Sequence, residues 1–314
     1  MAESKNMAPF QIVALFALIA AIAQVSLGGV VRVSDSGLGC PDWPLCHGQI
    51  IPALEFHTLI EYSHRLTGIL VGFSTLVLTT LAWRQYREDK RVLVFATLAL
   101  VLVLVAGGLG GATVLTDLAW WFVLLHLGIA EILVAAIIFT WISAVKPGRH
   151  NIEGGLQIRP PDNFDWLVIT ALVGLMVLLM FGSYMVGRGY GSSCGGWPLC
   201  NGIIFPTGKA FAIHMAHRYM TIIIGGLIMW TAYLTLNRNL SHPYLNRAAI
   251  SMAILFVTQI MIGATMVWTG YTAAAKGLHL IVGTLVWTTL VLLAATHFDQ
   301  RIWSTNRRNK SKSL

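Results

Sequence analysis

The chain has little charge and few cysteines for its length. Only 11% of its 314 residues are charged, whereas soluble proteins carry about 25%. Apolar residues make up 56% of the chain, and the mean hydropathy is +0.71. These values exclude a disordered chain and argue against a soluble globular domain. Four cysteines are too few for a disulfide scaffold. No dehydrogenase or phosphate-binding signature is present, because GGLGG at 107–111 lies in an apolar run where close helix packing explains it.

Long apolar runs occur eight times along the chain. About 20 apolar residues cross a bilayer as one helix, so the sequence predicts an all-α integral membrane protein with eight transmembrane helices. The first run is longer than the core of a secretory signal and leads into seven more, so we expect it to be retained. The predicted spans are Pro9–Val31, Tyr62–Trp83, Val92–Leu115, Trp120–Val145, Trp166–Val186, Ile213–Leu236, Ala248–Thr269 and Ala274–His297.

Basic residues are divided unevenly between the two sides of the predicted membrane protein. Fifteen of the 21 Lys and Arg residues lie at the termini and in the loops after the second, fourth and sixth spans. Because short cytoplasmic loops are enriched in Lys and Arg, both termini are predicted to be cytoplasmic. The two longest loops, residues 32–60 and 188–212, then face outward. This placement explains the net charge of +8 without a nucleic-acid partner, and none is expected.

The second half of the sequence repeats the first. GLGCPDWPLCHGQIIP at 37–52 aligns with GSSCGGWPLCNGIIFP at 191–206 at an offset of 154, and EYSHR at 61–65 aligns with HMAHR at 214–218 at an offset of 153. Four spans per half is an even number, so the halves are parallel repeats related by a pseudo-twofold axis along the membrane normal. The prediction is two four-helix bundles, residues 1–150 and 151–314.

Four of the ten histidines occupy equivalent places in the repeats: His64, His126, His217 and His279. Each lies near the start of an even-numbered span, so all four are expected at one depth near the outer face. A single buried histidine is usually satisfied by a hydrogen bond to a neighbouring helix, but four at one depth and one offset favour a functional site. Two imidazoles on facing helices of a bundle suit axial ligation of a haem iron. A zinc or di-iron site would need more ligands per bundle.

A carboxyl group distinguishes the first half from the second. Glu61 precedes His64 by three residues and therefore shares its helix face, whereas the second half has His214 in that place. A carboxylate beside an iron can move protons, position a substrate or stabilise a cationic intermediate. The alternative is that Glu61 lies in the first turn of its helix and interacts with the helix dipole.

Other polar residues near the outer face allow two interpretations each. Arg65, Arg218 and Lys276 could pair with haem propionates or could extend to the membrane surface as ordinary snorkelling side chains. The histidines in loops and near helix ends are expected to be solvated: His47, His57, His150, His242 and His297.

The cysteines form two pairs with identical spacing. Cys40 and Cys46 in the first outer loop, and Cys194 and Cys200 in the second, enclose five residues each. Because disulfides persist on the extracytoplasmic side, we expect the bridges Cys40–Cys46 and Cys194–Cys200. A structural role is favoured for the second pair, while a thiol redox role stays open for the first.

Taken together, these features resemble the bacterial type of haem A synthase. The resemblance rests on eight spans in two repeats, a cysteine pair in each large outer loop, EYSHR at the start of the second span and a histidine at the start of each even span. It covers essentially the whole chain. It implies an oxidoreductase that oxidises the C8 methyl group of haem O to a formyl group, which gives haem A for cytochrome oxidase. It also implies a multi-pass protein of the bacterial plasma membrane, surrounded by lipid, with extracytoplasmic cysteine loops.

The resemblance assigns different tasks to the two halves. Residues 151–314 are expected to bind haem b through His217 and His279, and this haem would serve electron transfer. Residues 1–150 are expected to be the catalytic half.

In that catalytic half, the resemblance implies that His64 and His126 receive the substrate haem. Glu61 is implied to be needed for catalysis, and Cys40 and Cys46 to take part in the mechanism. A complex with the haem O synthase is expected because the substrate is poorly soluble and reactive. The sequence identifies no electron donor.

Three other functions use part of the same pattern. A dihaem membrane cytochrome that transfers electrons from quinol would use the four histidines but gives Glu61 no task. A disulfide-forming thiol oxidoreductase explains the outer cysteines and leaves the histidines unexplained. A haem transporter needs a path across the membrane, which ligands at one depth do not suggest.

Overall fold

The computed structural model consists of eight long helices, and each of the eight found in the described part of the chain is long and apolar enough to cross a membrane. The structure describes residues 9–53, 55–145, 160–238 and 243–312, and the side chains of these residues except Pro243 and those from 300 onward. The prediction of an all-α protein with eight spans is therefore confirmed. The helices are α1 (Pro9–Val33), α2 (Phe56–Gln85), α3 (Lys90–Leu115), α4 (Trp120–Ala144), α5 (Asn163–Gly187), α6 (Lys209–Asn237), α7 (Pro243–Trp268) and α8 (Ala273–Lys312).

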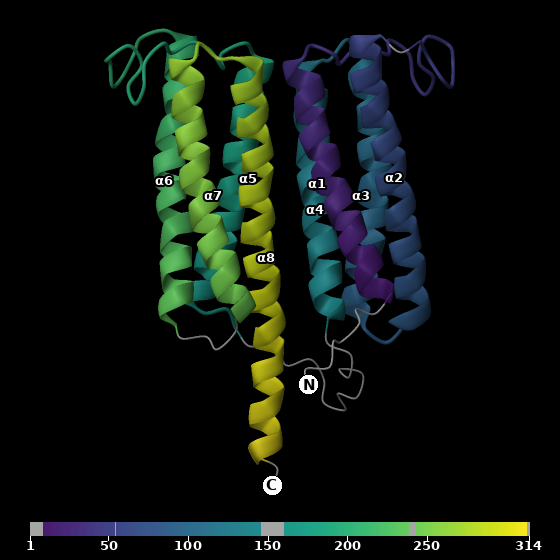
Figure 1. Ribbon diagram of the computed structural model, residues 1–314. Helices are drawn as coiled ribbons and strands as arrows, with labels where there is room; N and C mark the ends of the chain where they lie inside the picture. The colour runs from purple at the N-terminus through teal and green to yellow at the C-terminus, as the bar shows by residue number, and fades with distance from the viewer. Residues whose placement is uncertain (1–8, 54, 146–159, 239–242, 313–314) are drawn as a thin grey trace, which may run out of the picture.

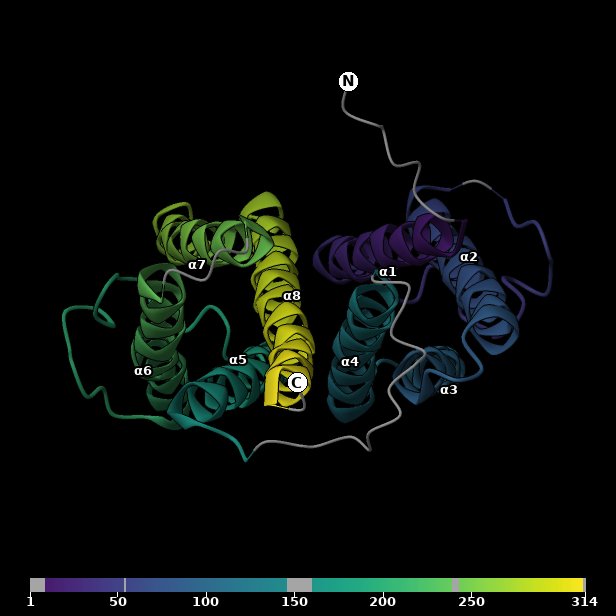
Figure 2. The ribbon, with the colours of Figure 1, turned by 90° about the horizontal axis from the view of Figure 1, so that it is seen from below.

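The helices form two groups of four that stand side by side (Figure 1). In the first group α1 packs on α2 and α4, and α3 packs on α2 and α4; in the second, α6 packs on α5 and α7, and α8 on α7 and α5. The two groups meet along a seam in which α1 and α4 contact α8, and α4 contacts α5 (Figure 2). One helix that carries a candidate ligand in each half, α4 or α8, therefore belongs to this seam.

Each helix turns one face toward protein and another toward lipid. On α1 the buried face contains Phe10, Ala14 and Ala17, which recur at the spacing of one helical turn. The opposite face exposes Ile12 and Phe16 at 54% and 49% of their surface. Small residues on the inner face let helices approach closely, and large apolar residues on the outer face suit contact with lipid chains.

Several helices begin or end beyond the apolar run that predicted them. α2 begins at Phe56 instead of Tyr62, α6 begins at Lys209 instead of Ile213, and α8 continues to Lys312. Hydropathy marks only the part of a helix that lies in hydrocarbon, whereas backbone hydrogen bonds continue through polar residues at the surface. As a consequence Glu61 lies in the second turn of α2, and α2 has no acidic residue in its first turn. The helix-dipole explanation of Glu61 is therefore wrong.

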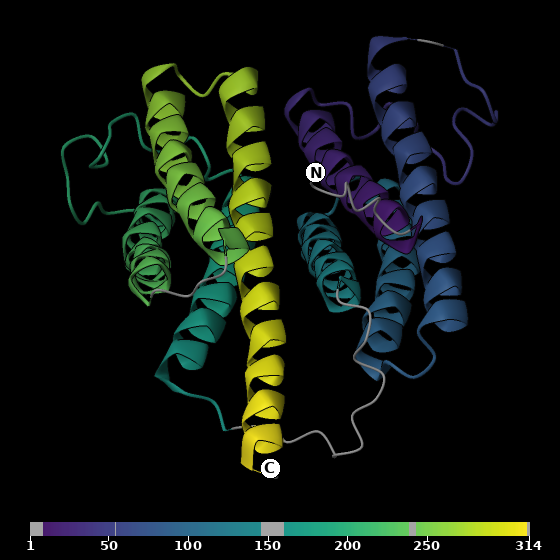
Figure 3. The same cartoon turned by 60° about the horizontal axis from the view of Figure 1, so that its bottom comes forward.

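The two cysteine loops lie on one side of the bundles, opposite to the side on which α1 begins and α8 ends (Figure 1). Both loops extend over the outer flanks, away from the seam (Figure 3). They share a local fold, because an isolated backbone bridge joins Cys46 to Gln49 in the first loop and Cys200 to Ile203 in the second. The repeat found in the sequence is thus present in the backbone. The loop residues Lys146, Arg149 and Arg159, used to predict the topology, lie outside the described residues.

Candidate functional site

The four repeated histidines lie in equivalent surroundings, two in each bundle. All four are partly buried, and each ring lies against a glycine of the helix that precedes it in the chain. A methyl group added to any of these glycines would come within 3.1–3.3 Å of the ring. The glycines therefore make room for the imidazoles, a role that the sequence interpretation missed. The pairs are Gly28 with His64, Gly110 with His126, Gly182 with His217, and Gly263 with His279.

In the first half the rings of the two candidate ligands lie close to each other. The ring centroids of His64 and His126 are 6.5 Å apart, and the ring planes make an angle of 68°. Metal–imidazole bonds are about 2 Å long, so a metal ion bound between two imidazoles holds their centroids roughly 6 Å apart. His126 Nδ1 lies 2.9 Å from the carbonyl oxygen of Ala106. An imidazole that donates there keeps an acceptor lone pair on Nε2, the atom needed to bind iron. The first pair therefore fits axial haem ligation.

In the second half one nitrogen of each candidate ligand is buried and unpartnered within the described residues. Nδ1 of His217 and Nδ1 of His279 are buried without a hydrogen-bond partner in the described part of the chain. The ring of Phe181 lies parallel to that of His217, with centroids 6.4 Å apart, and the Gln259 amide donates to the His279 carbonyl over 2.8 Å. The helix around these rings is thus held in place while the rings are not satisfied. In a purely structural pair of buried histidines these Nδ1 atoms would be expected to have hydrogen-bond partners.

Two protein ligands per bundle are what haem needs. Within the described residues there is no group of three or more His, Cys, Asp or Glu side chains that could hold a metal ion. A zinc or di-iron site requires such a group, whereas the porphyrin itself supplies the remaining ligands of a haem iron.

Glu61 lies beside the first pair and is held by an arginine. Its side chain is nearly buried, with 6% of the residue exposed, and Arg65 Nε donates to Oε1 over 3.1 Å. In the second half His214 occupies the same place and is 4% exposed. Arg218 Nη2 lies 3.2 Å from His214 Nε2. The two halves therefore share the arrangement and differ in the group that the arginine contacts.

Both arginines also bind the cysteine loops. The Arg65 guanidinium donates to the carbonyl oxygens of Asp42, Leu45 and Cys40 over 2.7–2.9 Å. Arg218 donates to two carbonyl oxygens of the second loop, those of Gly196 and Pro198, over 2.8 and 3.0 Å. These contacts give both side chains a structural task that neither snorkelling nor propionate binding describes.

The structure contains both predicted disulfides. Cys40 is bonded to Cys46 and Cys194 to Cys200, with Cα–Cα distances of 4.7 and 4.8 Å. All four sulfur-bearing residues are buried. The Tyr271 hydroxyl also donates to the Cys194 carbonyl. Because Tyr271 lies in the connection between α7 and α8, the second loop is also held by this part of the bundle.

Asp42 stabilises the turn inside the first cysteine loop. Its carboxylate accepts hydrogen bonds from the backbone N–H groups of His47 and Gly48 over 2.6 and 2.7 Å. These bonds, with that from Gly48 the strongest, hold the pKa of Asp42 below its ordinary value. The second loop uses a neutral group instead, because Asn201 Oδ1 accepts from the Gly195 N–H over 3.1 Å.

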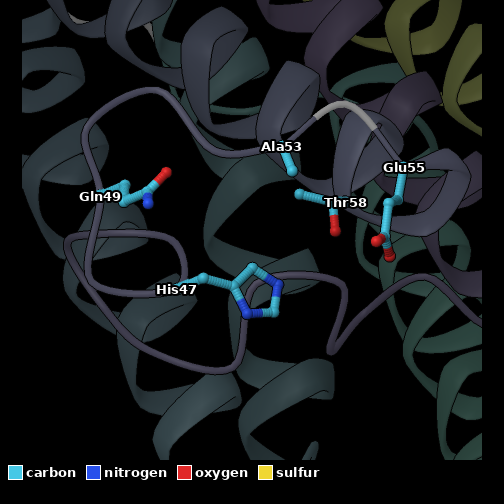
Figure 4. A pocket seen from close by; sticks show the side chains of 5 residues that line it. All are labelled: His47, Gln49, Ala53, Glu55 and Thr58. Carbon is cyan, nitrogen blue, oxygen red and sulfur yellow. The ribbon is translucent and has the colours of Figure 1, made fainter.

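An open hollow of about 230 Å³ lies on the first outer loop, apart from the histidine pairs (Figure 4). It is lined by His47, Gln49, Ala53, Glu55 and Thr58. None of the four candidate ligands contributes to it. It therefore belongs to the loop surface and not to the candidate site.

One prediction about the remaining histidines was wrong. His297 is not a solvated side chain, because its Nε2 lies 2.8 Å from Oδ1 of the fully buried Asp165, and only 12% of the histidine side chain is exposed. This pair joins α8 to α5 at the end of the bundle opposite to the cysteine loops. His47 and His57 are exposed as expected, and His150 and His242 lie outside the described residues.

The sequence is similar to those of known proteins over most of its length. The family model COX15-CtaA, described as a cytochrome oxidase assembly protein, matches residues 11–291. The heme A synthase of Alkalihalophilus pseudofirmus is 29% identical over 269 residues, which are 84% of this chain and 89% of that protein. The heme A synthase of Halalkalibacterium halodurans is 29% identical over 273 residues, 84% and 88% of the two chains. That of Lysinibacillus sphaericus is 26% identical over 309 residues, 91% and 97%.

Proposed function

The chain belongs to the COX15-CtaA family of cytochrome oxidase assembly proteins, and from this premise we propose that it is a haem A synthase. It is a multi-pass membrane oxidoreductase that converts haem O to haem A by oxidising the C8 methyl group to a formyl group. The relatives that carry this activity in their names align with both halves of the chain. The neighbouring imidazoles of His64 and His126, with the buried carboxyl of Glu61 on the same helix as His64, are the observation that carries the proposal.

We assign the two halves different tasks. Residues 1–150 receive haem O at His64 and His126, and residues 151–314 hold a resident haem b at His217 and His279. The assignment is supported by the difference at one repeated position, where the first half has a carboxyl group and the second an imidazole. His217 and His279 would hold this haem b, which would supply one-electron transfer when bound.

Glu61 is the proton-handling group of the first half. Conversion of a methyl to a formyl group replaces two hydrogen atoms of the carbon by one oxygen atom, and with dioxygen as the oxidant the second oxygen atom leaves as water. Protons must therefore be moved within the site. Glu61 lies one helical turn before His64, and its Oε1 is oriented by the Arg65 guanidinium. Its carboxylate can accept a proton at the edge of the haem site, while the arginine fixes its direction. In the second half, His214 bonded to Arg218 gives no such carboxylate.

The surroundings of the site follow from the same assignment. The cysteine loops are placed on the extracytoplasmic side of a bacterial plasma membrane, where their disulfides persist. Haem O reaches the first half from the membrane through a complex with the haem O synthase. An electron donor outside this chain exchanges electrons with the second half. Co-purification of the two enzymes in mild detergent tests the complex, and repeated failure to recover the pair counts against it.

The decisive experiment is haem extraction and chromatography from membranes that contain the haem O synthase. We expect haem A only when this protein is also present, and strongly reduced haem A with Glu61→Gln. Glu55→Gln is the matched control, because Glu55 is an exposed carboxyl just before α2, and it should leave haem A formation unchanged. If only haems B and O are found while the purified protein shows a low-spin haem spectrum, the protein is an electron-transferring cytochrome and the proposal is wrong.

A further inference from the structure

A second carboxyl group lies inside the membrane, at the seam between the two bundles. Glu131 is near the middle of α4, five residues after His126. Its equivalent in the second half, at the repeat offset of 153, is Thr284 of α8, five residues after His279. The two equivalent residues contact each other directly, so the pseudo-twofold axis passes between them.

The contact between Glu131 and Thr284 is asymmetric and is shielded from solvent. The Thr284 hydroxyl donates to Glu131 Oε1 over 2.8 Å, and the Trp287 indole N–H donates to the Glu131 backbone carbonyl over 2.8 Å. The three residues are only 1%, 3% and 5% exposed. Within the described chain Glu131 Oε2 is buried without any hydrogen-bond partner. Within the packed seam, Glu131 of α4 therefore accepts two hydrogen bonds from α8, one at its side chain and one at its backbone.

In the part of the chain that the structure describes, no charged group lies on the neighbouring helices at the depth of this carboxyl. The helices packed on α4 are α1, α3, α5 and α8, and their described titratable side chains lie toward the helix ends. Inward from Thr284, α8 has no such side chain before His297. The described titratable side chains of these four helices are Arg32 of α1, Lys90 and Arg91 of α3, Asp165 and Tyr184 of α5, and Lys276, His279, His297 and Asp299 of α8.

A carboxylate in this place would be a lone charge in a dry seam, accepting one hydrogen bond from a neutral hydroxyl. Such a charge is the least favourable state that a side chain can have inside a membrane. A neutral acid leaves only its Oε2–H group without a partner, and its Oε1 still accepts the hydrogen bond from Thr284. The contact with α8 therefore favours the acid form.

We propose that Glu131 is a positioning residue, an uncharged carboxylic acid that couples the two haem sites by holding α4 and α8 in register at the pseudo-twofold axis. The proposal rests on the proposed function, because it assumes a haem in each half. Through α4 the carboxyl sets the height of His126, and through α8 that of His279. A change at Glu131 should therefore alter the haem of the second half, although Glu131 belongs to the first.

Infrared spectroscopy of the purified full-length protein tests the protonation state without depending on activity. We expect a carbonyl band of a protonated carboxyl that is lost in Glu131→Gln. In Thr284→Val the band should move to higher frequency, because the hydroxyl no longer donates to the carbonyl oxygen. Thr140→Val is the matched control, since Thr140 is fully buried on the same helix and its hydroxyl, among the described residues, bonds only to the Ala136 carbonyl. It should leave the band unchanged.

The low-spin absorption and electron paramagnetic resonance spectra of the second-half haem test the coupling. Glu131→Gln keeps a neutral acceptor for Thr284 and should preserve these spectra, whereas Glu131→Leu and Thr284→Val should shift them. No band lost in Glu131→Gln would show an ionised carboxylate and overturn the proposal. Unchanged haem spectra in both Glu131→Leu and Thr284→Val would overturn the coupling. Absence of haem A formation by the wild-type protein would refute the proposed function alone, because neither spectroscopic comparison depends on that product.

Discussion

The glycine beneath each candidate ligand offers a sharp test of the haem sites. In the second half Gly182 of α5 lies under His217 of α6, and a methyl group on Gly182 would lie 3.3 Å from Cε1 of the ring and 3.8 Å from Nδ1. Gly182→Ala therefore adds one methyl group directly against a proposed axial ligand of haem b. The substitution leaves the ligand itself, its helix and the second histidine of the pair unchanged.

The size of the effect follows from the contact distance. Ordinary van der Waals contacts of a Cβ atom are 3.4–4 Å, so the imidazole must shift by a few tenths of an ångström. Overpacking of this kind costs about 1–3 kcal/mol, which is a factor of roughly 5 to 150 in haem affinity. Without haem the ring is free to yield, and alanine favours a helix over glycine by about 1 kcal/mol. The apoprotein should therefore be no less stable than the wild type.

The assay is the haem content of the purified protein, together with the rate at which haem passes to an excess of an apo-haem acceptor protein. Gly182→Ala should lose haem faster than the wild type and shift the low-spin spectrum. Gly226→Ala is the matched control, because no atom lies within 4 Å of the added methyl group, and it should behave like the wild type. If Gly182→Ala retains haem with the wild-type rate and spectrum, His217 does not bind the iron in the orientation described above.

Three further predictions concern packing, pH and the second disulfide. Gly225→Ala should lower the free energy of unfolding by about 1–3 kcal/mol, because its methyl group would lie 2.5 Å from the Phe256 ring. Thermal unfolding in detergent measures this change, and stability equal to that of the wild type would contradict the packing. Since the pKa of Asp42 is lowered in the fold, its stabilisation of the first loop should be complete above the ordinary carboxyl range and lost as the pH falls through the folded-state value. Proteolysis of that loop should accordingly increase in acid while the second loop, which contains no carboxylate, shows no such change, and equal acid sensitivity of both loops would refute the assignment. Replacing Cys194 and Cys200 by Ser should lower the free energy of unfolding by about 2 kcal/mol in the chain-entropy description while haem A formation persists; loss of haem A from a folded variant would show a task beyond stabilisation.

The parts of the structure that the sequence predicted are those encoded by a repeating pattern. Apolar runs identified eight spans, and the offset of 153 linked His126 to His279 before any contact was known. The helix ends were less predictable, because hydropathy does not detect helical turns in the polar surface layer. For this reason Glu61 was expected at the start of a helix, whereas α2 begins at Phe56.

Contacts between distant parts of the chain were beyond the reach of the sequence. His297 and Asp165 are 132 residues apart, and nothing near either residue indicates the other. The contact of Glu131 was not predicted, because the repeated histidines indicate a site only near the helix ends on the side of the cysteine loops. A signal was available, since an acid within an apolar span is rare and the repeat offset leads from Glu131 directly to Thr284.

The arginine of the first half gives the disulfide a means of influencing the carboxyl group from a distance. The bond between Cys40 and Cys46 restrains the loop whose carbonyl oxygens Arg65 binds, and the same guanidinium orients Glu61. Only the Arg65 side chain therefore separates this disulfide from the carboxyl group to which we assign proton handling. Reduction of the Cys40–Cys46 disulfide would let the loop carbonyl oxygens move away from the Arg65 guanidinium. Glu61, on helix α2, would then be the most firmly positioned partner of this arginine. The oxidation state of this cysteine pair would in this way be sensed at the proposed haem site, although neither sulfur atom needs to touch the porphyrin.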